Sequence, residues 1–352
     1  MPAILFDARW LRPGMTGVGH FSFRLLEALA VRRPDLGLVL PQGSPFRDRF
    51  PGARLFTAPV DLPDHPRTEF YEQFALPRLC RRHGFGTLVS LEARVPLLHP
   101  GLRTACFVYD LAHLKVKGSH GPRYTAYLNF TLQVLARSAD RIFTISETVR
   151  ADLALRLRRD PARIGVVHPS DSGLKGHAPV PVPAAGEEGG FLLAVGLTNP
   201  RKNLSALLDA FAAFRATHPG IRLVLTGNRA WIEKEMAGRD CRDVVNAGFV
   251  EEGQLRWLYE RARLLIFPSL DEGFGIPLVD ASVFGCPIAC SDIPVFREVA
   301  AGDAHYFDPR SPEAIAASMR LALESPKDSR PLASRFGWEK AAEAFLRGLG
   351  DA

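Results

Sequence analysis

Short apolar runs alternate with longer stretches of helical periodicity along most of the chain. In the first half, the apolar runs that favour strands cover residues 3–7, 36–41, 87–91, 103–109, 141–145 and 164–167. The stretches between them whose hydrophobic positions recur at helical spacing include residues 20–33, 68–83, 123–138 and 147–159. Strands that alternate with helices are typical of βαβ units, so we expect a parallel sheet.

Residues 169–190 interrupt this pattern. The segment, PSDSGLKGHAPVPVPAAGEEGG, is rich in proline and glycine and has no hydrophobic period, which predicts a linker. A second alternation follows, with apolar runs over residues 191–197, 221–227, 244–250, 263–269, 287–291 and 304–309. Its helical stretches cover residues 204–218, 231–238, 252–262, 312–324 and 338–348, and another begins near Pro277. The pattern therefore predicts an α/β fold with two Rossmann-like doubly wound domains that face each other across a cleft.

The composition agrees with this fold class. The 352 residues are 47% hydrophobic and 23% charged, which excludes a largely disordered chain and fits about two domains. No apolar run reaches the roughly 18 residues of a spanning helix, and the start, MPAILFDARW, has no signal-peptide pattern. The five cysteines are scattered without zinc-ligand spacing, so we expect a reducing, cytoplasmic setting.

Arginine supplies most of the positive charge. The net charge is +6, and seven of the 44 basic residues are lysines, which leaves 37 arginines. Such an excess fits nucleic acid, an anionic membrane or phosphorylated small molecules, and it fits codon bias equally well. The absence of interleaved aromatic and basic motifs argues against nucleic acid. Two predicted helices end in basic clusters that either complement the helix dipoles or form a basic face for anionic lipid; the clusters are Arg78, Arg81, Arg82 and His83, and Arg156, Arg158 and Arg159.

The strongest local signal is LIFPSLDEGFGIPLVD, over residues 265–280. An apolar strand runs into a glycine-rich loop, and Pro277 then stands where a helix would begin. The unpaired N–H groups of a helix start suit phosphate, whereas Glu272 in the loop would repel it. Glu272 therefore fits better as an acceptor for hydroxyl groups, such as those of a sugar. The alternative is a glycine-rich turn whose acid only caps the helix.

Two further loops follow predicted strands. Arg201 and Lys202, in NPRKN, could neutralise charge on a departing diphosphate, or they could form a solvated basic turn. Gly17 and Gly19, in TGVGHF, follow the first strand, but Ser22 stands where the third glycine of a dinucleotide motif would be. A lone pair of glycines is also common in ordinary strand-to-helix turns.

Several of these segments resemble one family. EGFGIPLVD resembles the E-x7-E motif of the family 4 retaining glycosyltransferases, which have two Rossmann-like domains in the GT-B fold. PSLDEGFGIPLVDASVFGCPIACSDIPVFREVAAGDAHYFDP resembles their donor-binding region. VGLTNPRKNLSALLDAFAAF resembles the opening of their second domain, and MTGVGHFSFRLLEAL their glycine loop and first helix. The motif departs from the family at its second acid, which is Asp280 in place of Glu.

The resemblance implies roles for these residues. Glu272 would bind hydroxyls of the donor sugar, and Asp280 would bind the nucleotide ribose. Arg201 and Lys202 would stabilise the departing diphosphate. The remaining donor-binding residues would be Gly17, Gly19, Thr198, Gly227, Asn228, Phe249, Gly273, Phe274, Gly275 and Ile276. For Gly227, Asn228 and Phe249, at predicted strand ends, a purely structural role is equally open.

Many family members have a His-Asp pair at the end of the strand that corresponds to the one predicted over residues 103–109, with the histidine near the transferred sugar. Here Tyr109 takes the place of that histidine and Asp110 keeps the acid. Either His113 reaches the site from one turn further, or the histidine's contribution is missing. The expected catalytic residues are thus Asp110, His113, Arg201, Lys202 and Glu272.

By the resemblance, residues 1–170 would bind the acceptor, 171–190 would link, 191–332 would bind the nucleotide sugar, and 333–352 would form a helix crossing back. We expect a retaining glycosyltransferase that moves a hexose or deoxyhexose, with mannose from GDP-mannose the leading candidate and a UDP-linked donor open. The acceptor would be a hydroxyl of a saccharide or lipid-linked saccharide in bacterial envelope or exopolysaccharide synthesis, reached by a cytoplasmic enzyme that touches the inner face of the membrane. No cofactor and no metal are expected, because neither an Asp-x-Asp motif nor a histidine cluster is evident. The alternative is a sugar-nucleotide epimerase or phosphorylase of the same fold.

Overall fold

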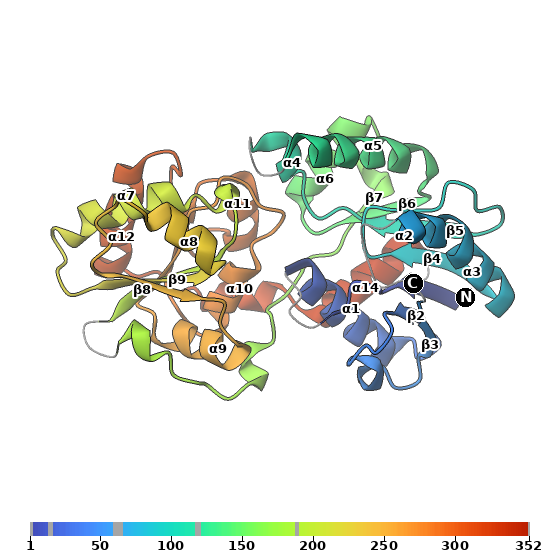
Figure 1. The fold of residues 1–352 in the computed structure, drawn as a ribbon, viewed down its shortest axis with the longest axis horizontal. Coiled ribbons are helices and arrows are strands. Elements are labelled where there is room, and N and C mark those ends of the chain that lie inside the picture. The colour runs from blue at the N-terminus through green and yellow to red at the C-terminus, as the bar shows by residue number, and fades with distance from the viewer. Residues whose placement is uncertain (1–2, 13–16, 59–65, 117–120, 187–189, 351–352) are drawn as a thin grey trace. The chain divides into compact units, whose positions relative to one another are not determined.

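The computed structural model describes residues 3–12, 17–58, 66–116, 121–186 and 190–350. The chain forms two compact units (Figure 1). Unit 1 comprises Met1–Leu111, Gly121–Pro169 and Gly337–Ala352, and unit 2 comprises Ala112–His120 and Ser170–Phe336. The chain thus leaves unit 1, builds most of unit 2, and then returns to unit 1.

Unit 1 contains a seven-stranded sheet in the order β3-β2-β1-β4-β5-β6-β7. Its strands are β1 (Ala3–Asp7), β2 (Gly37–Leu40), β3 (Arg54–Thr57), β4 (Phe85–Ser90), β5 (Arg103–Phe107), β6 (Arg141–Thr144) and β7 (Ile164–Val166). Every described pair is parallel, and Leu5 of β1 lies opposite both Gly37 and Leu88. The strand order changes direction between β1 and β4. Such switch points leave a crevice at the carboxyl ends of the strands, where doubly wound folds bind ligands.

Helices join these strands, as the periodicity predicts. They are α1 (Gly17–Arg32), α2 (Pro66–Phe70), α3 (Leu76–His83), α5 (Pro122–Ser138), α6 (Glu147–Leu157) and α14 (Trp338–Leu349). Ser146 caps α6 by accepting a hydrogen bond from the N–H of Val149 at 3.1 Å. The single helix expected over residues 68–83 is broken by a π-helical turn, Tyr71–Ala75, between α2 and α3.

Unit 2 contains a six-stranded parallel sheet in the order β10-β9-β8-β11-β12-β13. Its strands are β8 (Phe191–Leu197), β9 (Arg222–Gly227), β10 (Val244–Gly248), β11 (Leu264–Phe267), β12 (Ile288–Ser291) and β13 (His305–Phe307). Here the order changes direction between β8 and β11. The expected pair of doubly wound parallel sheets is therefore confirmed.

The helices of unit 2 include three that the sequence did not signal. The full set is α4 (Ala112–Lys115), α7 (Leu204–Arg215), α8 (Arg229–Met236), α9 (Glu252–Arg261), α10 (Ile276–Val283), α11 (Pro294–Ala300), α12 (Pro312–Glu324) and α13 (Arg330–Arg335). The unsignalled α4, α11 and α13 have four, seven and six residues, too few to establish a helical period. The segment 169–190 contains two 3-10 turns, Leu174–Gly176 and Pro183–Ala185.

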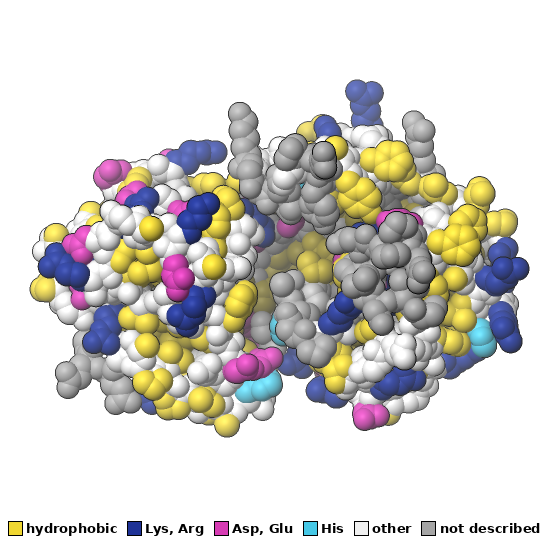
Figure 2. All heavy atoms as spheres, viewed as in Figure 1, with side chains coloured by type: hydrophobic (Ala, Val, Ile, Leu, Met, Phe, Trp, Pro, Cys, Tyr) yellow, Lys and Arg dark blue, Asp and Glu magenta, His cyan; other side chains and the backbone are white. Residues whose placement is uncertain are grey.

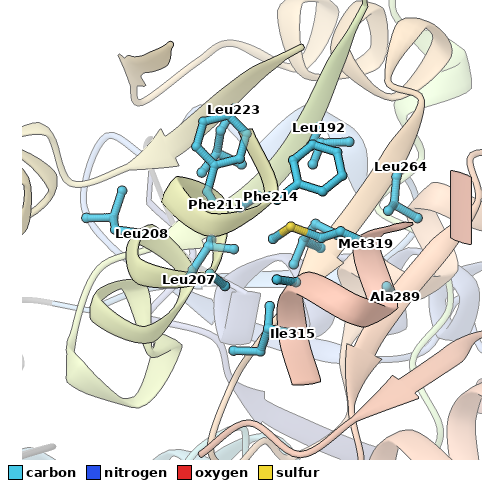
Figure 3. Close-up of a cluster of buried hydrophobic side chains, with 14 of the residues drawn as sticks. Leu192, Leu207, Leu208, Phe211, Phe214, Leu223, Leu264, Ala289, Ile315 and Met319 are labelled. Atoms are coloured by element: carbon cyan, nitrogen blue, oxygen red, sulfur yellow. The ribbon is translucent and has the colours of Figure 1, made fainter. Parts of the chain in front are cut away.

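The core of unit 2 lies where α7 and α12 cover the same face of the sheet (Figure 3). Phe211 and Phe214 of α7 and Met319 of α12 are essentially fully buried there, against side chains of β8 and β9. This packing makes the sheet a rigid base for the loops at its edge. Within the described part of the chain, no helix is long and apolar enough to cross a membrane.

Candidate active site

Two loops meet at the switch point of unit 2. A 3-10 turn, Pro200–Lys202, follows β8, and residues 268–275 follow the neighbouring strand β11. The N–H of Leu270 donates to the carbonyl of Arg201 at 2.9 Å, which ties the loops together. Asn203 adds a second tie, because its amide donates to the carbonyls of Pro268 and Pro309 at 3.2 and 2.7 Å. The side chains of these loops are therefore fixed relative to one another.

Glu272 lies at the centre of this junction and is only 8% exposed. Arg201 Nη1 donates to its Oε2 at 2.8 Å, and Lys202 Nζ donates to its Oε1 at 2.6 Å. Ser269 Oγ also donates to Oε1, at 2.8 Å. The structure thus brings together three of the residues that the sequence singled out, and adds Ser269, which it did not.

The electrostatics of the junction keep Glu272 ionised. Burial opposes the charged form of the carboxyl, but Lys202 and Arg201 outweigh it, so the pKa of Glu272 lies below its usual range. Lys202 Nζ also lies 4.9 Å from the centre of the Phe267 ring. Arg201 and Lys202 together place two positive charges against this carboxylate, and such charges attract an anionic ligand.

The loop after Glu272 leads into α10 through a sharp turn. Gly275 has φ of 109°, and a Cβ there would lie 2.9 Å from the Phe296 ring, so the turn requires glycine. Phe274 is 2% exposed, and its ring packs edge-on against Phe336 with centroids 5.0 Å apart. The Phe274 side chain therefore anchors the loop. The backbone of Gly273–Ile276 leads into the start of the helix, where the positive end of the helix dipole favours an anion.

Asp280 occupies a different position in α10 from the one expected. A helix that began at Pro277, as the sequence predicts, would place Asp280 in its first turn, but α10 begins at Ile276, so Asp280 falls in the second turn. It is 3% exposed. The N–H of Ser172 donates to Oδ1 at 2.7 Å and the Ser172 hydroxyl donates to Oδ2 at 2.8 Å. Nothing in the sequence pattern pointed to Ser172.

The ends of β8 and β9 carry three of the expected donor-binding residues. Gly227 has φ of 146°, and a Cβ there would lie 2.2 Å from the Leu197 carbonyl oxygen, so its structural role is clear. The N–H of Asn228 donates to that carbonyl at 2.9 Å, and its side chain caps α8. Thr198 accepts a hydrogen bond from Asn199 at 3.3 Å. Phe249, just after β10, is 75% exposed.

The remaining expected residues are distributed over both units. Gly17 opens α1 and Gly19 is buried within it. Asp110 follows β5 in unit 1, whereas His113 lies in α4, which groups with unit 2. Tyr109, at the place of the family's histidine, donates its hydroxyl to the Leu91 carbonyl at 2.7 Å. Burial raises the pKa of Tyr109, so this phenol acts as a neutral packing residue.

A second charged cluster, which the sequence reading missed, lies at the switch point of unit 1. Arg9 donates to Asp7 Oδ2 at 2.6 Å and to Glu72 Oε1 at 2.7 Å, and all three side chains are buried. Glu72 belongs to the π-helical turn, and its Oε2 is buried without a hydrogen-bond partner among the residues that the structure describes. Burial and the charge of Asp7 raise the pKa of Glu72 to about 7. In the sequence, the charged residues Asp7 and Arg9 of FDAR, at the end of β1, could have indicated this cluster, but FDAR matches no motif.

The described residues contain no group of three or more His, Cys, Asp or Glu side chains able to hold a metal ion.

Family models match both halves of the chain. Residues 15–170 match the model described as Glycosyltransferase Family 4, and residues 181–338 match the one described as Glycosyl transferases group 1. The chain belongs to the family 4 glycosyltransferases.

This glycosyltransferase is similar to O-antigen chain mannosyltransferase B of Escherichia coli, with 26% identity over 368 residues and 96% of both chains covered. It is 28% identical over 189 residues to the O-antigen chain mannosyltransferase RfbU of Salmonella typhimurium, which covers 52% of this chain and 51% of that one. A crystal structure of Anabaena Alr3699/HepE in complex with UDP and glucose covers 100% of both chains with a TM-score of 0.73 at 15% identity. That structural likeness shows the GT-B fold.

Proposed function

We propose that this glycosyltransferase moves a hexose or deoxyhexose, with retention, from a nucleotide sugar in unit 2 to a hydroxyl of a saccharide or lipid-linked saccharide. The observation that carries the proposal is the Glu272 carboxylate held between Arg201 and Lys202 at the switch point of unit 2. Residues 191–332 would bind the donor and residues 1–170 the acceptor. The reaction would need neither cofactor nor metal.

In this proposal the cations and the carboxylate divide the donor between them. Arg201 presents a planar fork and Lys202 a compact charge, so they stabilise the negative charge that develops on the leaving diphosphate. Glu272, oriented by both cations, accepts hydrogen bonds from hydroxyls of the transferred sugar. The N–H groups at the start of α10 bind the diphosphate. Catalysis then comes from orientation and charge stabilisation.

The other residues would complete the site. Asp110 and His113 would act near the transferred sugar, and Gly17 and Gly19 would let backbone approach the diphosphate. The exposed ring of Phe249 offers a stacking surface for the base. Thr198, Gly227 and Asn228 would shape the donor pocket from the ends of β8 and β9. Attack from the face that the diphosphate leaves, with the phosphate taking the acceptor's proton, would give retention.

The donor we propose is GDP-mannose, and the setting is bacterial envelope or exopolysaccharide synthesis. The support is that both E. coli and S. typhimurium relatives carry the name of O-antigen mannosyltransferases. The test is thermal stabilisation of the full chain by GDP, UDP and dTDP, followed by transfer assays with the matching sugars. Stabilisation by GDP and turnover of GDP-mannose are expected. Selective binding of UDP or dTDP would overturn GDP-mannose as the donor. If none of the three nucleotides binds, the proposed function is overturned.

We also propose that unit 1 contacts an anionic membrane, where a lipid-linked acceptor would reside. Unit 1 exposes large apolar side chains at Phe70, Phe74, Leu97, Leu98 and Phe130. The α2 helix is tied to α5 by Tyr127 Oη, which donates to Glu69 at 3.0 Å, and the π-helical turn is tied to residue 97 by Gln73. Arg78, Arg81 and Arg82 are exposed on α3, which continues the same run of helix. Figure 2 shows hydrophobic side chains exposed on this unit. Apolar side chains beside arginines favour an anionic bilayer.

A further inference from the structure

The carboxylate of Asp280 is held by a residue from outside the donor-site motif. Both of its oxygens accept hydrogen bonds from Ser172, Oδ1 from the N–H at 2.7 Å and Oδ2 from the hydroxyl at 2.8 Å. Two bonds from one residue to the two oxygens fix the plane of the carboxylate as well as its position. Burial raises the pKa of the Tyr259 phenol, and the negative charge of Asp280 raises it further.

Ser172 is itself held in place by its own turn. The N–H of Gly173 donates to Asp171 Oδ1 at 2.7 Å, which closes an Asx turn around Ser172. Residues 170–173 are the first residues of unit 2 after the chain leaves unit 1 at Pro169. The contact therefore joins the segment that enters unit 2 to the second turn of α10.

This arrangement matters because Asp280 is one methylene shorter than the glutamate of the family motif. A longer acid can adjust its reach through one more rotatable bond, whereas an aspartate must be placed by its surroundings. Each carboxylate oxygen can accept two hydrogen bonds, so one bond from Ser172 is compatible with a second from a ligand hydroxyl. A fixed carboxylate with its two oxygens side by side matches the two neighbouring hydroxyls of a ribose.

We propose that Ser172 is a positioning residue for the nucleotide donor: it holds the Asp280 carboxylate where the shortened acid meets the ribose hydroxyls. The inference rests on the proposed function, since it needs a nucleotide at this site. Ser172 acts through Asp280 and does not touch the reacting atoms. Its loss should therefore weaken recognition of the ribose and leave the chemical step almost unchanged.

The experiment compares nucleotide affinity in the full-length wild type, Ser172→Ala and Ser172→Thr by calorimetry. The probes are GDP and UDP, each beside its 2′-deoxy form. The wild type should bind the ribose form more tightly, because the buried Asp280 carboxylate lacks the 2′-hydroxyl as a hydrogen-bond donor when the deoxy form binds. Ser172→Ala should bind the ribose form about tenfold more weakly and lose the preference, while Ser172→Thr keeps both. In transfer assays the KM for the donor should rise, and kcat should stay within about threefold.

Ser282→Ala is the matched control. Ser282 lies on the same helix as Asp280, is buried, and donates its hydroxyl to the Val279 carbonyl at 2.8 Å. It should leave both affinities unchanged. If Ser172→Ala binds like wild type, or loses the ribose and deoxy forms equally, the positioning role is overturned and the proposed function stands. If wild type binds neither GDP nor UDP, the donor site itself is overturned, and this inference falls with it.

Discussion

Replacing Glu272 by glutamine tests the central feature of the proposed donor site. The amide keeps the shape of the side chain but removes the charge that Arg201 and Lys202 share in the ligand-free protein. Breaking a buried ion pair on one side costs about 3–5 kcal/mol. The two cation side chains are 16% and 12% exposed, so water relieves part of that cost and we expect a loss of about 2 kcal/mol in the free energy of unfolding.

Binding and turnover should move in opposite directions. Without this carboxylate, the site has one negative charge fewer beside Arg201 and Lys202, so the affinity for a nucleoside diphosphate should rise, by about threefold or more. Transfer should fall, because the sugar loses an oriented acceptor and the cations lose their orientation; removing one preorganised polar group typically costs about 10²–10³ in kcat. The measurements are calorimetry with the best-binding nucleoside diphosphate, initial rates with its sugar, and urea unfolding.

Asp240→Asn provides the comparison. Asp240 pairs with Arg215 at 2.6 Å and with Arg242 at 2.8 Å, but on the exposed surface of unit 2, where solvent screening leaves such pairs little effect on stability. This variant should keep wild-type affinity and rate. If Glu272→Gln retains most of its kcat, or binds the diphosphate more weakly than wild type, the shared-cation account of the site is refuted.

Three further predictions concern other parts of the chain. Gly227→Ala should destabilise unit 2 by about 3 kcal/mol or more, because its φ of 146° and the 2.2 Å approach to Leu197 exclude a Cβ; an unfolding temperature equal to that of Gly121→Ala, whose Cβ has open space, would contradict this. Glu72 keeps its proton in the folded protein up to about pH 7, whereas in the unfolded chain it loses the proton near its ordinary pKa of 4.5. The free energy of unfolding should therefore fall as the pH rises from 4.5 to 7, by about 3 kcal/mol in total. Glu72→Gln should remove that fall, and parallel stability curves for variant and wild type from pH 4.5 to 7 would rule the shift out. Phe70→Ser with Phe74→Ser should reduce sedimentation with anionic vesicles while sparing transfer to a water-soluble acceptor; unchanged sedimentation would exclude this face as the membrane contact.

The fold was predictable where hydrophobic pattern and burial coincide. Strands such as β8 and β11 are apolar throughout because parallel strands are covered on both faces, and their residues read as continuous runs. β3 escaped prediction because it lies at the sheet edge, where its RLFT sequence is partly or fully exposed and shows no apolar run. The π-helical turn escaped because a single extra residue per turn leaves the helical period almost intact.

The site was predictable only in its parts that are local in sequence. Glu272 and the Arg201–Lys202 pair stand directly after strands, and the strand order of unit 2 makes those loops neighbours. Their mutual ion pairs follow from the adjacency of β8 and β11, which composition does not reveal. Ser172 is 108 residues from Asp280, and no period or motif connects positions so far apart. The position of Asp280 in the second turn depended on where α10 begins, and a helix boundary is the least predictable feature of a sequence.

The return of the chain to unit 1 has a consequence for synthesis on the ribosome. The side chain of Phe345 in α14 is fully buried, and its ring lies 5.6 Å from Phe6, 5.8 Å from Phe107 and 4.8 Å from Phe143. These partners are made more than 200 residues earlier, so their apolar surface stays uncovered by α14 while most of unit 2 is translated. At about 5–20 residues per second, that wait lasts on the order of ten seconds or more. The nascent first unit is therefore an incomplete domain throughout that time. The apolar surface that α14 later covers is the kind of surface that chaperones bind.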